Sequence, residues 1–280
     1  MRLAPLFFIS HGAPTFALSP GRLGPMLQAL GQQLSGVTAI LVVSPHWQTH
    51  QTTVMTTAVP PTVHDFGGFG QALHALQYPA AGHPRWALEA ARALNRAGLT
   101  VQVDDRRGLD HGAWVPLRFL RPQADLPVFQ VSMPVSLDTA SAVRLGQALA
   151  PLREQGVLIV ASGSLTHNLY EFRPFNGEEA PYAREFVEWT RQAVVAQDVA
   201  SLVAYRRLAP HAARAHPSEE HFLPLLVALG ARSDDEPARV LDGGMTYGML
   251  SMESYVWGMP DATLIPADTP AVTEMENTAS

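Results

Sequence analysis

Three histidines follow three separate apolar runs of the chain, and imidazole is a side chain that both binds metals and transfers protons. They are His11, His46 and His167, and each lies within five residues of the end of its run. The runs cover residues 6–10, 39–44 and 157–162. If these runs are parallel strands of one sheet, their carboxyl ends share an edge, where open α/β sheets bind ligands. Burying the imidazoles together without a metal would leave nitrogen atoms unpaired. The pattern therefore predicts a shared metal or catalytic site.

Three further histidines are candidates for the same site. His221 stands at the entrance of an apolar helical segment, and His111 lies in a glycine-flanked turn before another. His64, followed by Asp65, lies in a proline-rich, aromatic stretch that fits neither helical nor strand periodicity, so we interpret it as a long functional loop. The remaining histidines have no such context, and we expect them to face solvent or cap local structure: His50, His74, His83, His211 and His216.

The elements that would position these side chains alternate along the chain. Short apolar runs predict buried strands over residues 6–10, 39–44, 128–132 and 157–162. Apolar spacing near 3.6 predicts helices over residues 22–34, 84–98, 137–155 and 181–195. We expect Ser218 to cap the helix that follows it and Pro224 to kink that helix. The predicted fold is a single α/β domain with a central, mostly parallel sheet, helices on both faces, and an active site at the carboxyl ends of the strands.

Composition excludes several classes of function. The chain has 280 residues, a net charge of -6 and no cysteine, which excludes a thiolate nucleophile and cysteine-ligated metal sites. We expect no nucleic-acid partner, because no strong basic excess is present. No apolar run approaches the ~20 residues of a membrane helix, so we predict no membrane association and a cytoplasmic location. We assign residues 1–266 to the catalytic domain and residues 267–280 to a polar, mobile tail; oligomeric state cannot be inferred.

Seven motifs occur in an order that resembles one known family, the class III (LigB-type) extradiol ring-cleavage dioxygenases, and in particular its 4,5-DOPA extradiol dioxygenase branch. The motifs are HG at residues 11–12, SPHW at 44–47, HDFGGF at 64–69, YPAAG at 78–82, LDHGAW at 109–114, ASGSLTHNL at 161–169 and EEHFLPLLVALGA at 219–231. Gly70 departs from the pattern, which has proline after HDFGGF. The resemblance spans residues ~6–257, nearly the whole chain.

The resemblance implies a mononuclear, non-haem metal site with Fe(II) as the working metal. His11 and His46 would be two ligands and His221 the third. His167 would be the catalytic acid and base, and could approach the metal as a fourth ligand. Among the remaining motif residues, His111 would be a second catalytic histidine contacting dioxygen or a substrate oxygen, whereas His64 and Asp65 would line the substrate pocket. The implied reaction is extradiol cleavage of a DOPA-like or related catechol acid with O₂.

Two alternatives stay open at the level of sequence. Three neutral imidazoles also suit Zn²⁺, so the purified protein could carry zinc, and a zinc-dependent hydrolase would use the same histidines. A non-catalytic binding module would leave the histidines as structural polar residues. The substrate itself is not identified, because no cation can be assigned to its carboxylate; Arg173 and Arg214 are the candidates considered.

Overall fold

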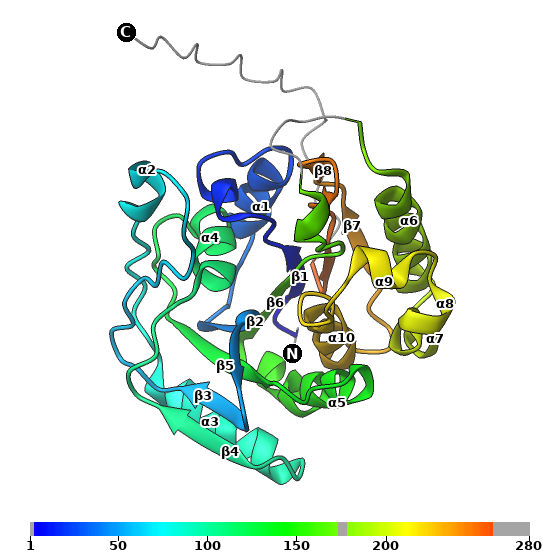
Figure 1. Cartoon of the computed structure of the whole chain (residues 1–280). Coiled ribbons are helices and arrows are strands. Elements are labelled where there is room, and N and C mark those ends of the chain that lie inside the picture. Colours follow the sequence, from blue (N-terminus) through cyan, green and yellow to red (C-terminus); the bar gives the residue numbers. More distant parts are fainter. Residues whose placement is uncertain (1–2, 173–177, 260–280) are drawn as a thin grey trace, which may run out of the picture.

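One large sheet organises the protein. The computed structural model describes residues 3–172 and 178–259, and within them eight strands pair in the order β4-β3-β5-β2-β6-β1-β10-β7 (Figure 1). The strands are β1 (Leu6–Ser10), β2 (Ala39–Thr49), β3 (Thr52–Met55), β4 (Val101–Asp104), β5 (Val128–Pro134), β6 (Val157–Gly163), β7 (Arg239–Leu241) and β10 (Ser254–Trp257). A separate small ribbon pairs β8 (Met245–Thr246) with β9 (Leu250–Ser251). The predicted single-domain α/β class is confirmed.

The four predicted strands form the parallel centre of the sheet. β2 pairs in parallel with β5 and β6, and β6 pairs in parallel with β1. β1 and β6 are buried along their full lengths, as is expected of parallel strands covered on both faces. The sheet becomes antiparallel where β10 joins β1 and where β3 joins β5. The carboxyl ends of β1, β2 and β6 therefore lie side by side at one edge.

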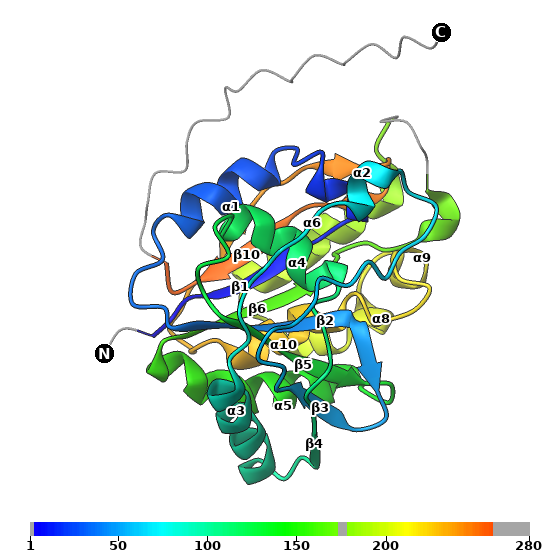
Figure 2. The same cartoon turned by 90° about the vertical axis from the view of Figure 1, so that its left-hand side faces the viewer.

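Helices cover both faces of the sheet (Figures 1 and 2). α4 (His111–Leu120), with α1 (Leu23–Gly31) packed on it, covers one face; α3 (Pro84–Arg96), α5 (Thr139–Leu149) and α10 (Leu223–Ala231) cover the other. The remaining α-helices are α2 (Gln71–His74), α6 (Pro181–Val195), α7 (Val199–Val203), α8 (Tyr205–Leu208) and α9 (Ala212–Ala215). Short 3-10 helices are η1 (Pro14–Ala17), η2 (Ala150–Gln155) and η3 (Leu169–Glu171).

Local physics explains several element boundaries. Asp110 and Asp138 cap α4 and α5 by accepting hydrogen bonds from first-turn backbone N–H groups. Pro181 begins α6, where its missing N–H and fixed φ suit the first helical position. The prediction for α10 is wrong in two respects. The helix begins at Leu223, so Ser218 does not cap it, and Pro224 lies in its first turn, where proline causes no kink.

The other predicted elements agree with the structure apart from their lengths. β2 continues through His46 to Thr49, so this histidine lies inside the strand rather than after it. A register irregularity between Val43 and Gln48 separates the regular part of β2 from that extension. Residues 58–70 contain no helix or strand, as predicted for a loop, and they lead into α2. No described helix has the length and apolarity to cross a membrane. The predicted tail and Arg173 lie outside the described residues.

Candidate metal centre

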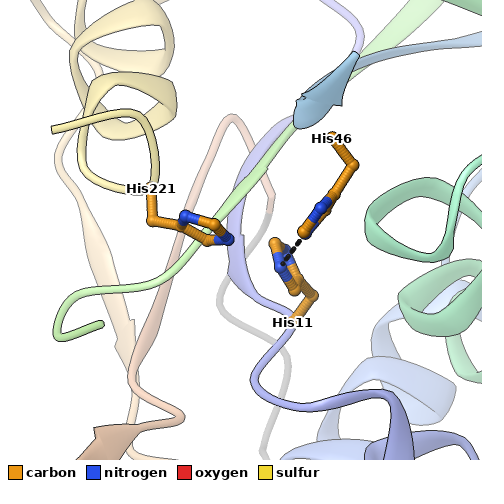
Figure 3. A group of neighbouring side chains, drawn as sticks. All are labelled: His11, His46 and His221. Carbon is orange, nitrogen blue, oxygen red and sulfur yellow. Dashed lines mark hydrogen bonds between the residues drawn. The ribbon is translucent and has the colours of Figure 1, made fainter. Parts of the chain in front are cut away.

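Three histidines from distant parts of the chain meet at the carboxyl edge of the sheet. His11 follows β1, His46 lies in β2, and His221 lies in the turn before α10 (Figure 3). One nitrogen from each ring can be chosen so that all lie within 4.8 Å of one another. Nε2 of His11 and Nε2 of His46 are 3.1 Å apart. Nε2 of His221 is buried and has no hydrogen-bond partner within the protein. A buried nitrogen of this kind needs a partner, and a metal ion would provide it.

The outer nitrogens of two of these rings are held by hydrogen bonds that fix the tautomer. Nδ1 of His11 lies 2.9 Å from Oγ of Ser162, and that hydroxyl already donates to the carbonyl of Gly112. The hydroxyl therefore accepts from Nδ1–H of His11. Nδ1 of His221 lies 3.0 Å from Oε1 of Glu220, a carboxylate that can only accept. Both rings thus present an Nε2 lone pair to the centre, as metal-bound histidines do.

Backbone contacts bring His221 to strands that are remote in sequence. The N–H of Ser164, just beyond β6, donates to the carbonyl of His221 at 2.9 Å. This approach requires Gly163, because a Cβ at that position would lie 2.5 Å from the same carbonyl oxygen. The N–H of His11 in turn donates to the carbonyl of Gly163 at 2.9 Å. Gly163 and Ser164 together thus tie two candidate ligands to the end of β6.

The electrostatic environment keeps the cluster neutral. Burial lowers the pKa of His11 and of His221 well below the ordinary value, and the neighbouring imidazoles lower both further. Burial also lowers the pKa of His46 to about 4, an effect to which the adjacent His111 adds. Neutral imidazole is the metal-binding form, so the site needs no deprotonation before a cation enters.

His111 and Asp65 form a pair beside this cluster. Asp65 Oδ1 accepts from the backbone N–H of His111 at 2.9 Å and lies 3.0 Å from its Nδ1. Burial alone would raise the pKa of Asp65, but the hydrogen bonds from His111 and the nearby imidazoles outweigh it and lower the pKa to about 2. The carboxylate is therefore ionised, and it leaves Nε2 of His111 as the nitrogen that can accept a proton. The rings of His111 and His46 have centroids 3.9 Å apart.

His167 stacks on one of the three clustered histidines, and His64 lies apart from them. The rings of His167 and His221 are nearly parallel, with centroids 3.4 Å apart. Burial lowers the pKa of His167 to about 4, although Glu220 opposes the shift. His64 instead donates from Nε2–H to the carbonyl of Leu76 at 2.9 Å. Three aromatic rings lie next to the ring of His64, those of Phe66, His74 and Trp114.

A buried carboxylate that the sequence analysis did not select supports two of these histidines. Asp110 is fully buried and accepts hydrogen bonds from four donors: Ser44 Oγ at 2.7 Å, Gln130 Nε2 at 2.8 Å, Arg107 Nη2 at 2.9 Å and the N–H of Ala113 at 3.2 Å. Arg107 also donates to the carbonyl of His46. Asp110 also caps α4, whose first residue is His111. Its position before a predicted helix was the signal available in the sequence.

Another departure from the sequence analysis concerns His216, which was expected to face solvent or to cap local structure. It is fully buried, with Nε2 2.7 Å from the carbonyl of Leu165 and with Phe222, Tyr205 and Phe186 around the ring. His216 is the C-terminal cap residue of α9, but the expectation that its ring faces solvent is wrong, because no local pattern showed which helices would pack over this residue. His83, by contrast, accepts from the N–H of Trp86 and caps α3, as predicted.

Together, the open α/β sheet and the histidine cluster define a class of enzymes that carry a metal at the carboxyl ends of their strands. Residues 8–257 match the family described as the catalytic LigB subunit of aromatic ring-opening dioxygenase, and the chain belongs to that family. It is therefore an extradiol aromatic ring-opening dioxygenase, and enzymes of this family depend on a metal.

Individual proteins show the same relationship. The chain is 39% identical over 253 residues to "4,5-DOPA dioxygenase extradiol" of Beta vulgaris, covering 89% of this chain and 94% of that protein. It is 37% identical over 255 residues to a protein of the same name from Escherichia coli (strain K12), covering 89% and 93%. A crystal structure of an uncharacterized protein from Escherichia coli K12 superposes with a TM-score of 0.74 at 32% identity, covering 90% of this chain and 99% of that one.

Proposed function

We propose that this chain is an Fe(II)-dependent extradiol dioxygenase that opens the ring of a DOPA-like or related catechol acid with O₂. The observation that carries the proposal is the convergence of His11, His46 and His221, with two Nδ1 atoms engaged outward and an orphaned Nε2 on His221. The substrate class is supported by the names of the relatives from Beta vulgaris and Escherichia coli.

The donor set fits a divalent transition metal. His11, His46 and His221 would hold it through three imidazole nitrogens, a ligand type that suits iron and zinc alike. Bound there, Fe(II) would supply open coordination positions for the catechol oxygens and O₂ and a route for electron density from the ring to O₂. Zn²⁺ would occupy the same nitrogens without redox chemistry, which makes it a plausible metal in the purified protein.

Two histidines beside the ligands would handle protons. His167 is neutral near pH 7, because its pKa is about 4, so it can accept the proton of a catechol hydroxyl and return it later. His111 would face a substrate or dioxygen oxygen through Nε2, because Asp65 occupies its Nδ1. In the neutral ring Nε2 accepts a hydrogen bond, and it donates one only after it has taken up a proton. Asp65 would then act on the substrate through His111.

Aromatic rings on the loop and on α4 would form the wall of the substrate pocket. Phe66 lies edge-on to His111, with ring centroids 5.6 Å apart. The ring centroids of Trp114 and His64 are 5.7 Å apart. Trp114 is fully buried, and its indole N–H donates to the carbonyl of Val63, which anchors the loop. His64 would contact the substrate from this wall, and the apolar surroundings would keep water from the reacting oxygen.

The test is oxygen uptake after anaerobic loading of the apo-protein with Fe(II), using a panel of catechols that includes DOPA. We expect uptake with a ring-fission product for at least one catechol, and none for the zinc-loaded protein or for His46→Ala. Failure of every catechol with a stoichiometric Fe(II) load would refute the proposal. Zinc-dependent hydrolysis without catechol turnover would favour the hydrolase instead.

A further inference from the structure

We propose that Glu220 and Asp65 act as counter-charges for the metal and strengthen its binding through the ligand histidines His221 and His46. This inference rests on the metal site of the proposed function. A ligand set of three neutral imidazoles leaves a divalent cation with its full charge, whereas the common two-histidine, one-carboxylate set removes part of it. Two carboxylates that lie behind the ligand histidines, beside their outer nitrogens, can balance that charge without becoming ligands.

The first contact is direct. Oε1 of Glu220 lies 3.0 Å from Nδ1 of His221, the nitrogen opposite the orphaned Nε2. A carboxylate that accepts from Nδ1–H makes the imidazole more electron-rich and so a stronger donor at Nε2. Ser218 Oγ donates to the same oxygen at 3.0 Å, which holds the carboxylate in place.

The second contact is longer. Oδ2 of Asp65 lies 3.8 Å from Nδ1 of His46, and the other oxygen is engaged by His111. At this distance the carboxylate acts through its charge rather than through a hydrogen bond. The side chains of Asp65 and Glu220 are 22% and 25% exposed, so both carboxylates keep some contact with water beside the centre.

Several other carboxylates of the protein differ from these two in their ion-pair partners. Glu219, Asp110, Glu253 and Glu236 each pair with an arginine. Among the described residues, the ion pairs of Asp65 and Glu220 are formed with imidazoles alone. Neither pairing therefore supplies the permanent positive charge that an arginine brings to those other carboxylates.

The third candidate ligand, His11, has a hydroxyl rather than a carboxylate at its outer nitrogen. Its Nδ1 contacts the neutral hydroxyl of Ser162. Two of the three candidate ligands thus have a carboxylate behind them, which matches the two positive charges of the metal.

The experiment measures the dissociation constant of Zn²⁺ by chelator competition at neutral pH, on the full chain and without turnover. We expect Glu220→Gln to weaken binding about 10–100-fold. Asp65→Asn should weaken it by a smaller factor, because its contact is longer, and the double variant should lose about the product of the two. Glutamine retains the acceptor oxygen for Nδ1–H, so Glu220→Gln removes the charge while keeping the hydrogen bond.

The matched control is Glu219→Gln, which removes a neighbouring carboxylate that pairs with Arg206 instead of a ligand. Its zinc affinity should equal that of the unaltered protein. The inference is overturned if Glu220→Gln and Asp65→Asn bind zinc as tightly as the control, or if only Glu220→Ala weakens binding, since loss of orientation alone would explain that result. If the unaltered chain binds no zinc, the metal site of the proposed function fails first.

Discussion

Replacing Asp110 by alanine should destabilise the protein and loosen the metal centre together. Asp110 is fully buried and accepts from four donors, one of them the guanidinium of Arg107, which is 20% exposed. Breaking a buried charged pair by removing one partner costs about 3–5 kcal/mol, and loss of a helix cap contributes about 1 kcal/mol. The two losses together come to about 4–6 kcal/mol, and because Arg107 keeps some contact with solvent we expect a total at the lower end, about 4 kcal/mol.

That loss corresponds to a lower melting temperature. With an unfolding entropy of about 2.1 cal/mol/K per residue, a chain of this length should lose about 7 °C in Tm. Thermal unfolding of the apo-protein by circular dichroism measures this change, and zinc titration of the folded variant should show weaker binding, because Arg107 no longer positions the carbonyl of His46. Asp110→Asn keeps one acceptor oxygen and should lose about half as much stability.

The control is Asp105→Ala, which removes an exposed carboxylate from the same loop and should leave Tm unchanged. The reasoning is refuted if Asp110→Ala melts within about 2 °C of the unaltered protein. It is also refuted if the variant is destabilised while its zinc affinity stays the same, because Asp110 would then support the fold without positioning the ligand histidine.

Four further outcomes are expected. His46→Ala should abolish stoichiometric metal retention, as measured by elemental analysis of the folded protein. His167→Ala should retain the metal and lose catechol turnover; metal loss in this variant would instead make it a fourth ligand. Gly112→Ala should weaken zinc binding, because the added Cβ would lie 2.3 Å from Ser44 Oγ and 3.0 Å from the ring of His46. Burial lowers the pKa of His216 to about 3 from 6.5, so the unfolded chain gains a proton as the pH falls below about 6.5 and stability declines toward pH 3. Urea unfolding at several pH values in this range measures how the free energy of unfolding changes with pH. In His216→Asn this slope should be smaller than in the unaltered protein by up to about 1.4 kcal/mol per pH unit.

Much of the fold could be predicted because its signals are local. The runs that became β1 and β6 are apolar throughout, since both faces of a parallel strand are buried, and this pattern is visible without any contact information. The position of His11 directly after such a run was enough to place it at the carboxyl edge. Proline at the start of α6 likewise marked a helix boundary that the structure reproduces.

The turn before α10 could not be placed in the same way. The sequence suggested that Ser218 begins the helix, but the chain reaches Leu223 before its backbone becomes helical. What holds His221 in position is a hydrogen bond from Ser164, more than fifty residues earlier, and the space left by Gly163. Such a close approach depends on both segments at once, and the sequence of neither segment indicates that the other will lie beside it.

Residue types and their spacing alone determined that this protein has an α/β sheet with imidazoles at the ends of its strands, because burial and periodicity act within a few residues. Tertiary structure decided which groups stand behind each imidazole. The carboxylate of Asp65 and the hydroxyl of Ser162 reach the outer nitrogens of His46 and His11 only after the loop and the sheet have packed together, whereas Glu220 directly precedes His221 in the chain. Hydrogen bonds and charge interactions act over a few ångströms in space whatever the separation along the chain, so the tautomers and the charge of the site belong to the folded protein.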